Sequence, residues 1–168
     1  PVVDALAETG TPFCGILYAG LMLTDDGPLV IEFNCRFGDP ETQVILPAWN
    51  GNMLDTMLAC VNGTLSSNDV PAEASGCAVC VVLAAEGYPG SYQKGIPLNT
   101  VPDTADYVTF HAGTAQVDGK LVSNGGRVLN AIGIGSDLTA AHTHAYELAE
   151  RLLVPGLFYR KDIAAKQD

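Results

Sequence analysis

Basic residues are scarce in this sequence. Its 168 residues include eight Lys and Arg against nineteen Asp and Glu, which gives a formal net charge of −11 at pH 7 and an isoelectric point near 4.4. Nucleic acids and acidic membrane surfaces bind proteins through a basic footprint, so the composition argues against both as partners. Acidic substrates must instead meet local cations, and Arg36 is one of the few groups available for that task.

Long hydrophobic runs and a signal-peptide pattern are also lacking. No apolar stretch reaches the roughly 20 residues that a membrane-spanning helix needs. No charged segment precedes a hydrophobic core at the start of the sequence. We therefore expect a cytoplasmic protein with no membrane partner.

The cysteines form an odd set of five, scattered through apolar contexts, and this predicts buried, reduced thiols rather than a disulfide framework. Cys77 and Cys80 have redox or zinc spacing, but they fall in a predicted strand, where an offset of three directs them to opposite faces. Neither a Walker-type loop nor a GxGxxG loop is present. If the protein binds ATP, most of that pocket must lie outside this chain.

The most informative segment runs from Ile31 to Gln43, where polar and apolar residues alternate. In a strand over residues 28–37, the side chains of Glu32, Asn34 and Arg36 share one face. Glu32 and Asn34 offer hard oxygen ligands of the kind that Mg²⁺ accepts, and Arg36 adds a planar fork of donors for phosphate or carboxylate oxygens. An ordinary antiparallel strand with one solvated face is the alternative interpretation.

A helix start follows this strand. Gly38 permits a tight turn, Asp39 is a good N-cap and Pro40 suits the first helical position, so a short helix is predicted over residues 40–46. The backbone N–H groups at that N-terminus would attract a phosphate.

The rest of the first half is predicted to hold two helices and a strand that pairs with the motif strand. A helix over residues 2–8 stops at Gly10, and Asn52 caps a second helix that ends before Gly63. An apolar strand over residues 13–23, buried on both faces, forms a hairpin with the motif strand through the turn at 24–27.

The second half reads as β-rich. His142 and His144 are expected to be exposed on a closing helix, and His111 to be a core or interface histidine. The loop over residues 88–95 is either a surface loop or an active-site lid. The expected strands are 77–85, 107–112, 114–117, 120–122 and 127–134, and the closing helix begins at Ser136 or Asp137 with Leu138, Ala141, Ala145, Leu148 and Leu152 as its apolar stripe.

Together these motifs closely resemble the phosphoribosylamine-glycine ligases of purine biosynthesis, also called glycinamide ribonucleotide synthetases, of the ATP-grasp superfamily. The resemblance covers nearly the whole chain. It rests on Gly15-Ile-Leu-Tyr-Ala-Gly-Leu-Met22, Ile31 to Gln43, Glu86-Gly-Tyr-Pro-Gly90, Phe110-His-Ala-Gly-Thr114, Asn124-Gly-Gly-Arg-Val-Leu129 and Phe158-Tyr-Arg-Lys-Asp-Ile163.

The resemblance implies an α+β chain. Residues 1–65 would be the C-terminal part of an ATP-grasp lobe of antiparallel strands and helices, 66–75 a linker, and 76–168 a small β-rich C-terminal domain closed by a helix. Such enzymes carry further domains upstream, so we expect a C-terminal fragment, inactive alone, whose partner is the missing N-terminal half.

The resemblance also implies a reaction. With ATP as co-substrate, glycine is joined to 5-phosphoribosylamine through glycyl phosphate. Glu32 and Asn34 would hold Mg²⁺ or Mn²⁺, while Arg36 and Asp39 would act in catalysis, by neutralising charge and shaping the acceptor pocket. Many ATP-grasp enzymes place another acid on the preceding strand, but residues 18–22 carry none. A different ATP-grasp ligase, or a non-catalytic β-rich interaction module, are the alternatives.

Overall fold

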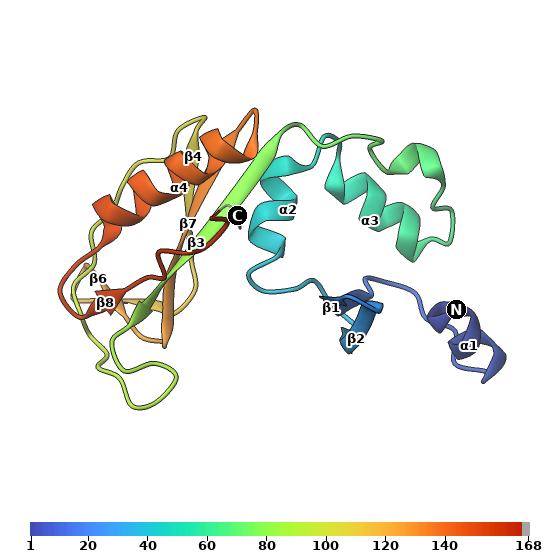
Figure 1. Ribbon diagram of the computed structural model, residues 1–168, viewed down its shortest axis with the longest axis horizontal. Helices are drawn as coiled ribbons and strands as arrows, with labels where there is room; N and C mark the ends of the chain where they lie inside the picture. Colours follow the sequence, from blue (N-terminus) through green and yellow to red (C-terminus); the bar gives the residue numbers. More distant parts are fainter. Residues whose placement is uncertain (166–168) are drawn as a thin grey trace. The chain divides into compact units, whose positions relative to one another are not determined.

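The computed structural model describes residues 1–165, so the last three residues of the predicted domain 76–168 lie outside it. The chain divides into two compact units, one of residues 1–39 and 49–73 and the other of residues 40–48 and 74–168. Figure 1 traces both. The boundaries that the sequence predicted at residues 65 and 76 stay predictions, and each unit is described by itself.

The first unit begins with helix α1 (Val2–Glu8), as predicted. The backbone leaves the helix at Thr9 and then adopts a left-handed conformation at Gly10, where φ is 79°. Glycine is the residue that most readily takes this conformation at a helix end.

An antiparallel hairpin of β1 (Tyr18–Thr24) and β2 (Gly27–Asn34) follows, with its turn where the sequence predicted it. The expected extent and burial of the first strand are wrong, because β1 starts five residues later and Leu23 is 82% exposed. Within residues 1–165 the two strands pair only with each other, and apolar side chains such as Leu21 and Ile31 are at least half exposed.

Helix α3 (Met53–Val61) starts at its predicted cap, since the Asn52 side chain accepts from the backbone nitrogens of Leu54 (3.1 Å) and Asp55 (3.4 Å). The 3₁₀ turn η1 (Ser67–Asp69) lies in the segment expected to be a linker.

The second unit is built on a four-stranded antiparallel sheet in the order β4-β7-β3-β8. Runs of β-branched and other apolar residues explain β3 and β7, whose inner side chains form the core. The short edge strand β8 was not predicted. The bounds are β3 (Cys77–Ala85), β4 (Tyr107–His111), β7 (Arg127–Gly135) and β8 (Leu157–Phe158), so the predicted ends of the first three are right to within one residue.

A second hairpin, β5 (Thr114–Val117) with β6 (Lys120–Ser123), turns at Asp118 and Gly119 as predicted. Both turn residues have positive φ, 49° and 75°, which is the type I′ geometry that matches strand twist. Helix α2 (Thr42–Ala48) also belongs to this unit and contacts β3 and β7.

Helix α4 (Leu138–Leu152) covers one face of the sheet, and Asp137 caps it by accepting from the backbone nitrogen of Ala140 at 2.8 Å. Ala141, Ala145, Leu148 and Leu152 are fully buried, whereas Leu138 is 51% exposed. The predicted stripe is therefore right except at Leu138, which lies in the first turn of the helix.

The backbone of α4 approaches β7 closely at Gly133. A Cβ atom there would overlap the carbonyl oxygen of Ala141 and the backbone nitrogen of Ala145. Small residues on both elements thus let the helix and strand backbones approach closely.

Two expectations about single residue types are wrong. None of the five thiols is buried: Cys14 and Cys35 are exposed and the others half-buried, and none of the five forms a disulfide. His142 and His144 are half-buried rather than exposed, and Nδ1 of His144 lies 2.7 Å from the carbonyl oxygen of Ile134. None of the helices in the described part of the chain is long and apolar enough to cross a bilayer.

We predict that Gly133→Ala destabilises the second unit by about 1–3 kcal/mol or more, because the added methyl group must displace backbone atoms of α4. The φ angle of Gly133 lies outside the left-handed region, so only the methyl group matters. Native-state hydrogen exchange at α4 and β7 amides measures the loss. Glu147→Ala, on the exposed face of α4, is the control and should change little.

We also predict a local pH effect at η1. The Ser66 hydroxyl and backbone N–H both donate to Asp69 Oδ2 at 2.7 Å, and these hydrogen bonds lower the pKa of Asp69 from its usual 3.8. The stabilisation is therefore present above that value and is lost as pH falls through the lowered pKa.

In an NMR titration, Ser66→Ala should raise the pKa of Asp69 towards its usual value, because the largest cause of the shift is removed. Ser67→Ala changes the next hydroxyl along the chain and should leave the titration as it was. Equal curves for both variants would contradict the capping argument.

Candidate functional site

The predicted metal ligands lie together at the end of β2. Asn34 Nδ2 donates to Glu32 Oε1 at 2.9 Å, so the two side chains share one face of the strand. The amide nitrogen is a donor and cannot bind a cation. A cation here would therefore take the amide oxygen of Asn34 and carboxylate oxygen from Glu32.

Gly20 faces Glu32 across the hairpin, a relation that the sequence did not predict. The two residues are paired in register, and a Cβ atom at Gly20 would come within 3.2 Å of Glu32 Cγ. The absent side chain leaves room for Glu32 to lie over β1. Tyr18 pairs with Asn34, so β1 places no acid opposite either ligand, as the sequence indicated.

Arg36 does not continue the polar face of the strand. Since β2 ends at Asn34, opposite the first residue of β1, no partner strand holds the next residues extended. The backbone bends at Cys35 and Arg36, and Arg36 Nη1 donates to the carbonyl oxygen of Phe37 at 2.8 Å. The predicted strand over 28–37 is thus too long, and the proposed anion-binding role of Arg36 stays a prediction.

The predicted helix start after Asp39 is also wrong. Helix α2 begins at Thr42, and the first carbonyl to accept helical bonds is that of Glu41, from Val44 N at 3.1 Å and Ile45 N at 3.0 Å. Glu41 therefore takes the cap position predicted for Asp39. The role of Asp39 in an acceptor pocket remains a prediction.

Three of the distinctive motif segments meet in the second unit through glycines. Ala112 N donates to Val128 O at 3.0 Å, and Asn124 N donates to Gly113 O at 2.7 Å. A Cβ atom at Gly113 would overlap Gly125, and one at Gly126 would overlap the Tyr88 ring. The loop over residues 88–95 is thereby fixed at Tyr88 against the start of β7.

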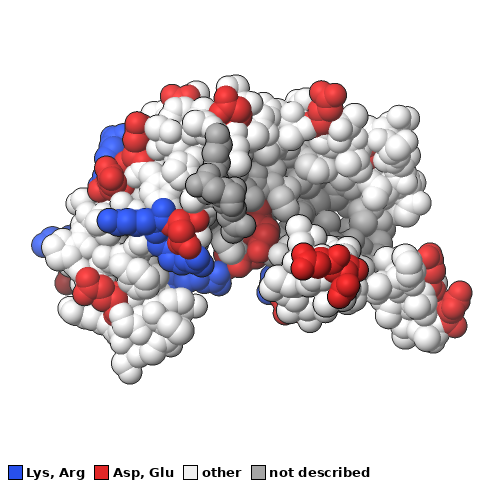
Figure 2. All heavy atoms as spheres, in the orientation of Figure 1, with Lys and Arg blue, Asp and Glu red and all other residues white. Residues whose placement is uncertain are grey.

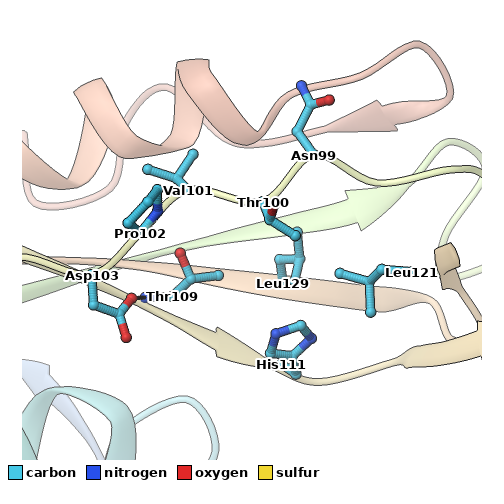
Figure 3. Close-up of a pocket in the computed structure, with 9 residues that line it drawn as sticks. All are labelled: Asn99, Thr100, Val101, Pro102, Asp103, Thr109, His111, Leu121 and Leu129. Carbon is cyan, nitrogen blue, oxygen red and sulfur yellow. Dashed lines mark hydrogen bonds between the residues drawn. The ribbon is translucent and has the colours of Figure 1, made fainter. Parts of the chain in front are cut away.

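A cavity of about 230 Å³ lies beside β4 in the same unit (Figure 3). Asp103 Oδ1 accepts from Thr109 N at 3.0 Å, and Thr109 Oγ1 is buried with no hydrogen-bond partner among the described residues. His111 points into the cavity and bonds Thr114 Oγ1 through Nδ1 at 3.0 Å. His111 is exposed, so it is not a core histidine, and its expected place at an interface stays a prediction.

The cations available for acidic substrates are few, and Figure 2 shows acidic side chains on the surface of both units. Arg160 forms a bidentate pair with Asp162 (3.0 and 2.6 Å), and this hydrogen bonding lowers the pKa of Asp162. The Tyr146 hydroxyl fixes the same segment, donating to Arg160 O and accepting from Ile163 N, both at 3.0 Å.

Two family models match this chain. The phosphoribosylglycinamide synthetase C domain matches residues 78–166, and the ATP-grasp (A) domain of phosphoribosylglycinamide synthetase matches residues 1–42. The chain belongs to the phosphoribosylglycinamide synthetase family. The family that the motifs resembled is thus confirmed, and the ATP-grasp (A) match contains Glu32, Asn34, Arg36 and Asp39.

Individual relatives agree with the family models. A phosphoribosylamine–glycine ligase of Caldanaerobacter subterraneus is 45% identical over 98% of this chain and 39% of its own length. A trifunctional purine biosynthetic protein adenosine-3 of Gallus gallus is 47% identical over 96% of this chain and 16% of its own. The chain thus spans about two fifths or less of the length of these synthetase relatives.

Solved structures confirm the α+β fold. The crystal structure of phosphoribosylamine–glycine ligase from Thermotoga maritima has a TM-score of 0.83 and 42% identity, covering 95% of this chain and 39% of that one. The biotin carboxylase domain of a Hydrogenobacter thermophilus 2-oxoglutarate carboxylase has a TM-score of 0.64 at 16% identity, covering 96% and 38%. At 16% identity, this second similarity shows a shared fold and nothing more.

We predict that this synthetase chain by itself binds Mg²⁺ more weakly than about 1 mM, since two protein oxygens leave most of the cation's octahedral shell to water. Within residues 1–165, no group of three or more His, Cys, Asp or Glu could hold a metal ion. Isothermal titration calorimetry measures the affinity, with Glu32→Gln as control. Micromolar binding that Glu32→Gln abolishes would overturn the two-ligand description.

Proposed function

We propose that the complete protein carrying this chain is an ATP-dependent ligase that joins glycine to 5-phosphoribosylamine, giving glycinamide ribonucleotide, ADP and phosphate. The observation that carries the proposal is the hydrogen-bonded pair of Glu32 and Asn34 on β2, within the segment matched by the family's ATP-grasp model. Because the chain spans only part of its relatives, ATP, glycine and phosphoribosylamine as substrates, and the remainder of the enzyme as partner, belong to this proposal.

The donor set of Glu32 and Asn34 fits Mg²⁺ or Mn²⁺, because carboxylate and amide oxygens are hard ligands. A cation held there would neutralise phosphate charge while phosphate passes from ATP to the glycine carboxylate. The hydrogen bond from Asn34 orients the Glu32 carboxylate, and Gly20 keeps the space over β1 into which Glu32 extends.

Arg36 and Asp39 would contact the substrates rather than the cation. Arg36 sits two residues past Asn34 and is exposed, so its guanidinium can exchange the Phe37 carbonyl for a phosphate or carboxylate oxygen. Asp39 would shape the site of the acceptor amine, which attacks the activated carbonyl of glycyl phosphate. Water must be kept from that acyl phosphate until the amine has reacted.

The family match favours this reaction over the alternatives. A different ATP-grasp ligase would share the fold, as the biotin carboxylase domain does at 16% identity, but not the motif segments that extend from β2 to the end of the chain. A non-catalytic module has no observation in its favour. A cytoplasmic location is part of the proposal, supported by five cysteines that form no disulfide, as suits a reducing compartment.

We predict that Glu32→Gln in the complete enzyme lowers turnover by more than about 100-fold. Mutating a residue that only hydrogen-bonds to a metal ligand typically lowers metal affinity or activity by about 10–100-fold, and replacing the ligand itself should cost more. Folding should be unaffected, since Glu32 is exposed. Phosphate release at saturating ATP, glycine and phosphoribosylamine measures turnover.

Asp26→Asn is the matched control, because it removes a charge from the turn of the same hairpin. It should retain full turnover. Near-normal activity of Glu32→Gln would refute the metal-ligand assignment, and the chain of 168 residues alone should release no phosphate.

A further inference from the structure

Two thiols lie side by side in the first unit, although 46 positions separate them. Cys14 follows α1 on the way to β1, and Cys60 lies in the last turn of α3. Cys14 Sγ donates to the carbonyl oxygen of Cys60 at 3.2 Å.

Both cysteines line one cavity of about 410 Å³ on the surface of this unit. Cys14 is exposed and Cys60 half-buried, so a small reagent that enters the cavity can reach the first sulfur directly. The other cavity-lining side chains include Val3, Phe13 and Leu17, which carry no charge that would repel a reagent of either sign.

The titration of Cys14 agrees with this proximity. A side-chain hydrogen bond with Cys60 raises the pKa of the Cys14 thiol, and Coulomb repulsion between the two sulfurs and desolvation add to it. Charge repulsion of this kind requires the two sulfurs to lie close together.

We propose that Cys14 and Cys60 form a dithiol that a small-molecule disulfide, such as oxidised glutathione, converts into an intramolecular disulfide. The Cys14 thiolate attacks one sulfur of the reagent, forming a mixed disulfide and releasing one thiol. The Cys60 thiolate then attacks Cys14 Sγ and displaces the second thiol. The protein loses two thiol protons and two electrons, and the reagent gains both as two thiols.

The remaining three cysteines lie on or near two strands, β2 and β3. Cys35 is exposed in the bend after β2. Cys77 and Cys80 lie three apart on β3, which directs their side chains to opposite faces of the sheet. A bond between Cys14 and Cys60 would tie the segment that leads into β1 to the end of α3.

The experiment treats the complete protein, at micromolar concentration, with oxidised glutathione. Remaining thiols are then blocked with N-ethylmaleimide and the digest is analysed by mass spectrometry. We expect a peptide pair linked through Cys14 and Cys60, about 100-fold or more above any disulfide between two molecules, because the second thiol acts at an intramolecular effective concentration in the millimolar range.

Three variants separate the steps. Cys60→Ser should accumulate glutathione on Cys14, because the thiol that resolves the mixed disulfide is gone. Cys14→Ser should abolish the link, and Cys35→Ser should leave its yield unchanged. The proposal is overturned if the protein without substitutions keeps a stable glutathione adduct on Cys14, or if neither cysteine reacts. It is also overturned if Cys35 forms disulfides with Cys14 or Cys60 in equal yield.

Discussion

Side chains absent at a few glycines set the distances on which both units depend. Gly133 lets the backbone of α4 lie directly on β7. Gly113 lets the segment 110–114 contact Gly125 in the segment 124–129. Gly20 does the same on a smaller scale, by giving Glu32 room above β1. Each contact joins two different elements or loops, and an added methyl group would crowd or overlap the neighbour in every case.

Much of the second unit could be predicted from sequence because its signals are local. Runs of apolar and β-branched residues predicted β3 and β7, and Asp118 with Gly119 predicted the tight turn. Each of these patterns lies within a few consecutive residues. The failures depended on distant partners. The end of β2 is set by where β1 begins, which the alternation up to Phe37 could not reveal.

The candidate site divides in the same way. A period of two placed Glu32 and Asn34 on one face, and their hydrogen bond bears that out. Their relation to Gly20 could not be foreseen, because the register shifts between Gly20 and Leu21. The cap expected at Asp39 moved to Glu41, since several residues nearby could serve as the first acceptor and packing of α2 on β3 and β7 chose among them.

The register shift in the first hairpin also bears on protein design. Beyond it, β1 is offset by one residue against β2, so that Leu21 pairs with Val30 while Gly20 pairs with Glu32. A designer who transplanted only the Glu-x-Asn triplet onto a regular hairpin would bring neither the offset nor the bare position opposite the carboxylate. A design should therefore transfer both strands together with the register shift, because the triplet alone lacks the glycine that faces the carboxylate.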